Sequence, residues 1–276
     1  MLLLDKPQGG SSNAALQEVK RLYGAAKAGH TGSLDPIATG MLPICFGEAT
    51  KFSQYLLDSD KRYQAIAKLG EKTSTGDIEG EIIQKVDAFD LSDEQIDSVV
   101  QGFIGPIDQV PPMYSALKHQ GQPLYKLARQ GLEIERPARR VTIYSLQWRR
   151  LDAQHLELNV FCSKGTYIRT FVEDIGEQLA CYAHVAALRR VQVGPFSGEM
   201  MTMAHLRQLT ESGTLDALDA LLLPQESTLS AYPRVLLDEK NAIAFARGQT
   251  VTLSTCDAAP CGLRQVWRSQ SEQPAY

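Results

Sequence analysis

Residues 155–179 read HLELNVFCSKGTYIRTFVEDIGEQL and change from a strand pattern to a helix pattern within one stretch. From His155 to Cys162, apolar and polar residues alternate as on a half-buried strand, apart from Phe161. Ser163–Thr166 then supplies the small and polar residues of a turn. Beyond the turn, apolar residues return at the spacing of an amphipathic helix, at Ile168, Phe171, Val172, Ile175 and Leu179. The stretch therefore predicts a strand, a turn and a helix in direct succession.

The same two patterns recur along the chain. Further strands are predicted over Met1–Asp5, Tyr63–Leu69, Glu81–Ile83, Val141–Trp148 and Val185–Val193. Helices are predicted over Ser11–Tyr23, from a capping box at Ser92 and Gln95 to Phe103, and over Met203–Leu223, with a linker at Pro224–Pro233. Because the strands come in hairpin-like pairs with helices between the pairs, we expect an α+β fold.

Composition sets the outer bounds on function. Hydrophobic residues make up 43% of the 276-residue chain and charged residues 22%, which is ordinary for a globular protein. The formal net charge of −4 does not itself indicate nucleic-acid binding, which depends on a local basic face. Charged residues follow the first few apolar residues too closely for a signal peptide. The sequence contains no apolar run of about 18 residues that would predict a membrane span. Five scattered cysteines argue against a disulfide framework or a zinc site, so we expect a cytoplasmic protein.

The segment His30–Gly40 reads HTGSLDPIATG and carries one carboxylate, Asp35. Its glycines, proline and hydroxyl residues favour a loop, since glycine frees the backbone and proline fixes it. On spacing alone, Asp35 fits a cap or a turn at least as well as a base or a nucleophile. A metal site is disfavoured because His30 is the one neighbouring ligand type. His30 by itself is more typical of a structural, hydrogen-bonding histidine than of a general base.

Arg169 stands in the first turn of the helix predicted from Ile168, shortly after Lys164, Gly165 and Thr166. The helix dipole does not favour a cation there. Arg169 is therefore either an exposed surface residue or the partner of an external anion, such as a carboxylate or a phosphate. The GxxxxGK[ST] pattern is absent, so a nucleotide-binding loop is not supported.

Two further segments combine basic and aromatic residues. Lys61-Arg62-Tyr63 has the composition of a base-stacking platform, although on these three residues an ordinary strand edge is the better interpretation. From Met113 to Arg140 the chain is polar and basic with interspersed tyrosines. This composition fits either a solvated loop or a long irregular insertion that grips RNA.

Together, these segments resemble the TruB family of tRNA pseudouridine synthases. The resemblance runs from Leu2 to about Leu223 and is carried by several motifs in the same order, namely Leu3–Pro7, Gly32–Gly40, Pro43–Lys51, Lys61–Tyr63, Met113–Lys118 and Lys164–Arg169. The string around Asp35 is highly specific. It departs from the family at Ser33, where the family usually has Ala, and this is a small change.

The resemblance implies an isomerisation that needs neither a metal nor another cofactor. The enzyme breaks the N1–C1′ bond of one uridine, turns the uracil and rejoins it through C5; the substrate is the TΨC-loop uridine of tRNA, conventionally position 55. By motif match, the catalytic residues are Asp35, Arg169 as its ion-pair partner, and Tyr63, which would stack on the extruded base and move a proton. The residues matched to substrate binding are His30, Tyr167 and Leu188. A carboxylate can attack a sugar carbon, add to the pyrimidine ring or remove a sugar proton, and these roles stay open.

The resemblance also implies the pseudouridine synthase fold, a mixed, largely antiparallel central sheet with flanking helices, over residues 1–229. The segment at about 113–140 would be its RNA-clasping insertion. Residues 230–276 resemble the opening of a small, β-rich, PUA-like RNA-binding domain at Phe245–Gln249 and Gly262–Trp267. Because the chain starts inside the first strand motif and stops before the closing strands, we expect shortened ends and an incomplete PUA-like domain. The expected partner is the T-arm of tRNA, bound by a monomer with no membrane and no obligate protein partner.

Two other classes of function stay open. A non-catalytic RNA-binding or RNA-folding protein on the same scaffold would not need Asp35 together with Tyr63 and Arg169. A hydrolase with Asp35 as its nucleophile is disfavoured by the missing metal-ligand spacing and by the basic insertion.

Overall fold

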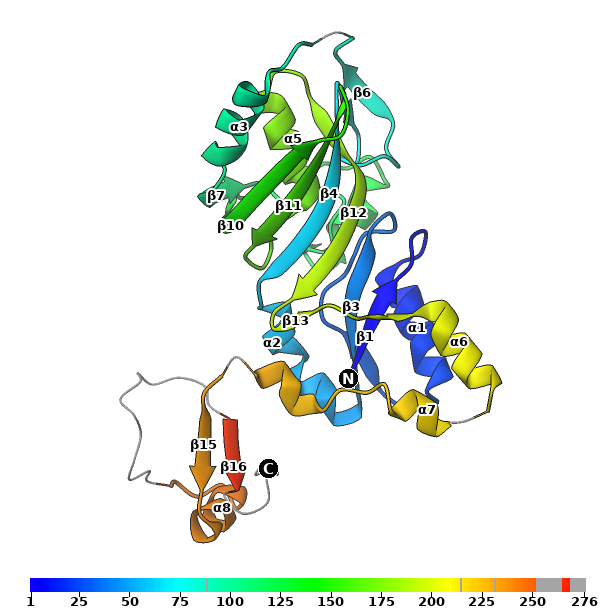
Figure 1. The fold of residues 1–276 in the computed structure, drawn as a ribbon, viewed down its shortest axis with the longest axis vertical. Coiled ribbons are helices and arrows are strands. Elements are labelled where there is room, and N and C mark those ends of the chain that lie inside the picture. Colours follow the sequence, from blue (N-terminus) through cyan, green and yellow to red (C-terminus); the bar gives the residue numbers. More distant parts are fainter. Residues whose placement is uncertain (88, 214, 231, 252–264, 269–276) are drawn as a thin grey trace. The chain divides into compact units, whose positions relative to one another are not determined.

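The computed structural model describes residues 1–87, 89–213, 215–230, 232–251 and 265–268, and the chain divides into two compact units, Met1–Leu222 and Leu223–Tyr276 (Figure 1). The strands are β1 (Leu2–Lys6), β2 (Ala28–His30), β3 (Thr39–Phe46), β4 (Lys61–Leu69), β5 (Glu71–Thr73), β6 (Ile82–Lys85), β7 (Gly105–Gln109), β8 (Lys118–His119), β9 (Gln122–Pro123), β10 (Arg139–Arg150), β11 (His155–Cys162), β12 (Ala183–Val193), β13 (Phe196–Ser197), β14 (Met201–Thr202), β15 (Arg234–Leu237) and β16 (Gln265–Arg268). The helices are α1 (Ser12–Leu22), α2 (Ser53–Leu57), α3 (Asp93–Gly102), α4 (Leu124–Ala128), α5 (Ile168–Gln178), α6 (Met203–Glu211), α7 (Leu215–Asp219) and α8 (Glu239–Ala246), with 3-10 turns at Gly47–Phe52 and Gln225–Leu229.

The strand, turn and helix of residues 155–179 form as predicted. Along β11, the buried positions alternate with half-buried ones, which gives the strand one face in the core. Helix α5 starts directly after Tyr167 and packs its apolar stripe against β12 and β4. The ring of Phe171 on this stripe meets that of Phe103 edge to face, with centroids 5.3 Å apart, and so ties α5 to the end of α3.

The first unit is built on one ten-stranded sheet. Its main path runs β14-β1-β3-β12-β4-β11-β10-β7, with β2 beside β3 and β13 beside β12. The β1–β14 and β3–β12 pairs are parallel and the other pairs antiparallel. Helices α3 and α5 cover one face of β10, β11, β4 and β12, and α1 and α6 lie beside β1 (Figure 1). The predicted α+β fold with a mixed, largely antiparallel sheet is confirmed.

A narrow seam joins two parts of this sheet. Strands β3 and β12 pair at two positions, Arg189 with Thr39 and Arg190 with Gly40, whereas β12 and β4 pair along most of their length. We call β14, β1, β3 and β2 the first half-sheet and β12, β4, β11, β10 and β7 the second. Gly40 permits this approach, because its φ is +98° and an added Cβ would lie 2.2 Å from the Arg190 carbonyl oxygen.

Several segments differ from the predicted elements. Strands β2, β3 and β7 were not predicted; β3 contains Pro43 and β7 contains Pro106, and proline is untypical of a strand inside a sheet. The helix predicted over Met203–Leu223 is wrong as one element: the segment contains α6 and α7, and Gly213 follows α6 with φ +84°. The insertion is less irregular than expected, since it holds the short β8–β9 hairpin and α4. The predicted linker at Pro224–Pro233 contains a 3-10 turn.

In the second unit, β15 and β16 pair in parallel and α8 packs against both. The motif Phe245–Gln249 covers the end of α8 and the residues after it. Of the motif Gly262–Trp267, the first three residues lie outside the described part of the chain. A PUA-like domain in this unit therefore stays a prediction.

Candidate active site

Asp35 lies on the loop between β2 and β3, and buried groups hold this loop. The Ser12 hydroxyl accepts from the Leu34 N–H at 2.7 Å and donates to the Leu34 carbonyl at 3.0 Å. Lys6, which is fully buried, donates its Nζ to the Ala38 carbonyl at 2.9 Å. The side chains of Leu34 and Ala38 are buried too, whereas 35% of the Asp35 side chain is exposed. The loop thus holds a fixed backbone and presents one accessible carboxylate.

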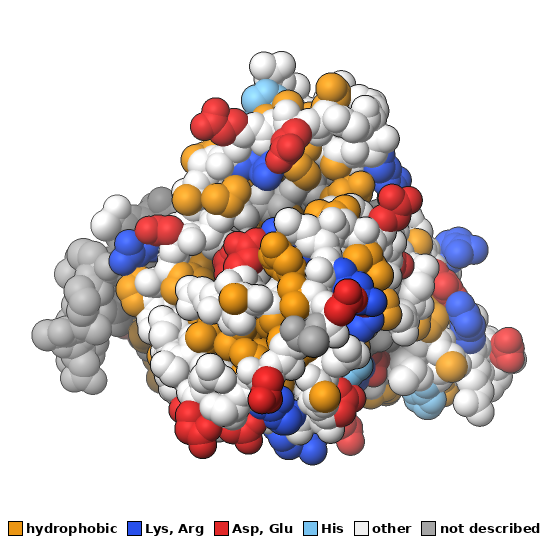
Figure 2. Space-filling view, turned by 90° about the horizontal axis from the view of Figure 1, so that it is seen from above, with side chains coloured by type: hydrophobic (Ala, Val, Ile, Leu, Met, Phe, Trp, Pro, Cys, Tyr) orange, Lys and Arg blue, Asp and Glu red, His pale blue; other side chains and the backbone are white. Residues whose placement is uncertain are grey.

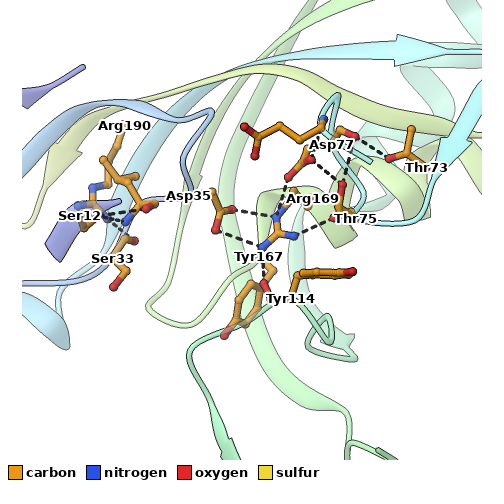
Figure 3. Close-up of polar contacts among 12 residues, drawn as sticks. Ser12, Ser33, Asp35, Thr73, Thr75, Asp77, Tyr114, Tyr167, Arg169 and Arg190 are labelled. Carbon is orange, nitrogen blue, oxygen red and sulfur yellow. Dashed lines mark hydrogen bonds and ion pairs between the residues drawn. The ribbon is translucent and has the colours of Figure 1, made fainter. Parts of the chain in front are cut away.

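Asp35 forms a two-point ion pair with Arg169 (Figure 3). Arg169 Nε lies 2.8 Å from Asp35 Oδ2, and Nη2 donates to Oδ1 at 3.2 Å. The Arg169 side chain is 4% exposed, so the sequence-based alternative of an exposed surface arginine is wrong. The external anion that a cation in the first turn of a helix requires is the carboxylate of Asp35.

The rest of the Arg169 guanidinium is engaged as well. Nη1 donates to the Thr75 carbonyl at 2.8 Å and Nη2 to the Tyr114 carbonyl at 2.6 Å, so both the β5–β6 loop and the start of the insertion contact it. Asp77 Oδ2 lies 3.7 Å from Arg169 Nε. A guanidinium so buried and so partnered is not placed to bind an RNA phosphate, and the accessible member of the pair is Asp35.

Asp77 is a site residue that the sequence patterns did not single out. It is 4% exposed, and its Oδ1 accepts from the Thr75 hydroxyl at 2.6 Å and from the Glu79 N–H at 3.1 Å. These bonds hold the carboxylate beside Arg169 (Figure 3). The available signal was an acidic residue closing the turn-rich stretch after a predicted strand, and that signal is common to many surface turns.

The surroundings of Asp35 set its protonation. Burial raises the pKa of Asp35 above its ordinary value; Arg169 opposes this rise, and the nearby carboxylate of Asp77 adds to it. The two-point bond to a permanent cation keeps the carboxylate oriented. Asp35 is therefore a more basic carboxylate than one in water.

Tyr63 and Leu188 lie on strands of the second half-sheet, and Tyr167 stands directly before α5. Tyr63 on β4 and Leu188 on β12 are 9% and 7% exposed and belong to the core cluster that also contains Leu34 of the Asp35 loop. Tyr167 precedes α5, where the Gln109 side chain accepts from its N–H at 2.8 Å and donates to its carbonyl at 3.1 Å. Burial raises the pKa of both tyrosines.

His30 and Lys61 occupy less open positions than an RNA-contacting surface would suggest. His30 on β2 is half-buried, and its Nδ1 makes no hydrogen bond within the described part of the chain. Burial, and next the Arg190 cation, lower the pKa of His30. Lys61 is 6% exposed and donates to the carbonyls of Leu56 and Leu57. The basic pair before Tyr63 is thus partly a structural feature.

Across the described residues, no group of three or more His, Cys, Asp or Glu side chains is arranged to hold a metal ion. None of the helices in that part of the chain has the length and apolar character to cross a bilayer. On the face drawn in Figure 2, Lys and Arg side chains are interspersed with acidic and hydrophobic ones.

The chain belongs to the TruB family: residues 20–168 match the TruB family pseudouridylate synthase (N terminal domain), and residues 169–230 match the tRNA pseudouridylate synthase B C-terminal domain. It is 54% identical to tRNA pseudouridine synthase B of Shigella boydii serotype 4 (strain Sb227), over 92% of this chain and 83% of that protein. The protein of the same name from Escherichia coli (strain K12) is 53% identical over the same shares.

Solved structures show the same fold. A chain of a Cbf5-Nop10-Gar1 complex superposes with a TM-score of 0.70 at 27% identity, covering 90% of this chain and 66% of that one. A chain of an H/ACA RNP bound to a substrate RNA containing 2′-deoxyuridine gives a TM-score of 0.74 at 22% identity, covering 97% and 74%. These superpositions show that the chain shares its fold with both of these proteins.

Proposed function

We propose that this chain converts the T-loop uridine of tRNA at position 55 to pseudouridine, with Asp35 as the residue that engages the bound nucleoside. Its TruB family membership and the named relatives make it an isomerase acting on uridine in tRNA. The observation that carries the residue-level proposal is the pair formed by a 35% exposed Asp35 and a 4% exposed Arg169. The Asp35 carboxylate is therefore partly accessible, whereas the Arg169 guanidinium that pairs with it is buried.

The reaction is an isomerisation. The N1–C1′ bond breaks, a C5–C1′ bond forms, C5 loses its hydrogen and N1 gains one, so substrate and product have the same formula. The chain must therefore break the glycosidic bond, hold the free uracil while it turns and move a proton. Asp35, ionised and oriented by Arg169, supplies the carboxylate that starts this sequence.

The target base must leave its stack to reach Asp35. An enzyme that acts on a stacked base flips it into a pocket and compensates the lost stacking with an aromatic or apolar face. We assign this face to Tyr63 and Leu188, with Tyr167 near Arg169 (Figure 3). His30, kept neutral by burial and by Arg190, would contact the RNA near the flipped base.

The insertion of residues 113–140 and the second unit would bind the remainder of the T-arm. In α4, Lys126 is exposed and Arg129 follows it, stacked over the Tyr125 ring at 5.7 Å. An arginine held on an aromatic ring presents its charge to phosphates with little loss of side-chain freedom. We further propose that residues 230–276 form a PUA-like RNA-binding domain and that the chain acts as a monomer in the cytoplasm, without a cofactor.

The test is the conversion of an unmodified T-arm hairpin RNA, with pseudouridine measured at the loop uridine. Asp35→Asn keeps the shape but removes the carboxylate, so we expect at least a ~10³-fold loss of activity, the scale seen when a catalytic group is removed. RNA binding, followed by filter retention, should stay within a few fold of the wild type.

Each alternative predicts a different result. Product formation by Asp35→Asn at the wild-type rate would contradict the role of Asp35. Release of free uracil would indicate a hydrolase. RNA binding by the wild type without any pseudouridine would indicate a non-catalytic RNA-binding protein.

A further inference from the structure

Arg190 on β12 lies at the seam between the two half-sheets, with 1% of its surface exposed. Its Nε donates to the Met41 carbonyl at 2.8 Å, Nη2 to the Gly32 carbonyl at 3.0 Å and Nη1 to the Ser33 carbonyl at 3.5 Å. Gly32 and Ser33 precede Asp35 and Met41 follows the loop. One guanidinium therefore holds both ends of the loop that carries Asp35, on the side away from Arg169 (Figure 3).

The same residue adjoins the stacking tyrosine. Arg190 pairs in register with Tyr63 of β4 on one side and with Gly40 of β3 on the other. Because residues paired across neighbouring strands point to the same face of the sheet, the side chains of Arg190 and Tyr63 are neighbours. Arg190 thus contacts the catalytic loop of the first half-sheet from the strand next to Tyr63 in the second.

Burying a cation is expensive, and an apolar side chain of similar size often replaces a buried charge at no cost in stability. Packing alone therefore gives no reason for an arginine here. The three carbonyl oxygens that converge on the Arg190 side chain do give a reason for an arginine. A guanidinium presents a rigid, planar fork of N–H donors, and an ammonium does not.

We propose that Arg190 is a positioning residue for the isomerisation, which fixes the Asp35 loop at its working distance from Tyr63. The inference rests on the proposed function, in which Asp35 and Tyr63 act on one flipped uridine. A shift of about 1 Å in a reacting group costs on the order of 10²-fold in rate. Arg190 has no direct part in holding the T-arm, so its loss should slow turnover while leaving RNA affinity in place.

The test compares Arg190→Met and Arg190→Lys with Arg189→Met. Arg189 is the matched control, because it is the next residue of β12, 38% exposed, and pairs with Asp5 at 2.8 Å. On the unmodified T-arm hairpin we expect Arg190→Met to lower kcat by about 100-fold with KM within about threefold of wild type. Arg190→Lys should restore a minor part of the rate, and Arg189→Met should stay within about threefold.

A second readout separates positioning from general loosening of the fold. Since Arg190 helps to lower the pKa of His30, the NMR titration midpoint of that imidazole should move up in Arg190→Met and stay near wild type in Arg190→Lys. A folded Arg190→Met enzyme with wild-type kcat would overturn the proposal, as would a rise in KM alone. Failure of both Arg190 variants to fold would assign the residue to stability and overturn it too. If the wild type makes no pseudouridine, the proposed function itself is wrong.

Discussion

The Asp35 loop and the insertion of residues 113–140 are both irregular segments next to the same site, yet they are held in opposite ways. The backbone of the loop is held by hydrogen bonds from the buried side chains of Lys6, Ser12 and Arg190. The insertion contacts the site through the Tyr114 carbonyl, and it exposes Lys126 of α4 and Arg129 directly after α4. On the proposed function, the fixed loop would serve the breaking of the glycosidic bond, and the exposed charges of the insertion would serve RNA binding. Substitutions on the two sides should therefore change different kinetic constants.

The largest effect is expected from Arg169→Lys, which changes the ion-pair partner of the Asp35 loop. Lysine keeps the positive charge but cannot make the two-point bond to Asp35 while also reaching the carbonyls of Thr75 and Tyr114. We expect kcat to fall by about 10²- to 10³-fold, as when a preorganised electrostatic partner is lost. Single-turnover kinetics with the T-arm hairpin would measure it. A fall in affinity with unchanged kcat would instead mean that Arg169 binds the RNA backbone.

Charge removal on the insertion should have a smaller effect of another kind. Lys126→Gln combined with Arg129→Gln should raise KM by about 3- to 10-fold and lower the slope of log K against log salt by about 1 to 2, with kcat unchanged. Glu133→Gln is the control, because this carboxylate lies in the same insertion and is 84% exposed. A fall in kcat that salt does not alter would show that the insertion also shapes the catalytic pair.

The smallest effect concerns the stability of the fold and comes from α5, the helix that carries Arg169. Burial raises the pKa of Glu173 on α5 from 4.5 to about 7. Between these values the unfolded chain loses the proton that the folded chain keeps, so this residue makes stability fall as pH rises. Glu173→Gln should therefore stabilise the protein at pH 8 by something on the order of 1 to 3 kcal/mol and have no effect at pH 4.

Urea unfolding at the two pH values would measure this gain. The exposed Glu133→Gln variant should change stability at neither pH, because an exposed carboxyl titrates alike in both states. An equal gain from Glu173→Gln at pH 4 and pH 8 would contradict an origin in ionisation.

Sequence reasoning predicted many of the strands and helices and part of the site. Alternation and helical spacing gave β11 and α5, and the unfavourable place of Arg169 in a helix dipole showed that it needed an anion. That this anion is Asp35 came from the family resemblance, because the two residues are 134 positions apart and no local pattern links them.

The rest of the site depends on tertiary structure. Asp77, Gln109 and Arg190 look like ordinary polar residues in the sequence. Each is buried by pairing that the chain makes elsewhere: Asp77 bridges to β12, Gln109 meets the start of α5, and Arg190 is placed by the seam. A period-2 pattern shows which face a side chain lies on, but not which neighbour the strand acquires.

The narrow seam between the half-sheets gives the Asp35–Arg169 ion pair a second, structural role. Asp35 is carried by the first half-sheet and Arg169 by a helix packed on the second, while β3 and β12 meet at two residue pairs. The Asp35–Arg169 bond is therefore also a cross-link between two bodies that share a short joint. A uridine held between Asp35 and Tyr63 would span the same seam. Bound substrate would therefore link the two half-sheets at the position where its glycosidic bond is broken.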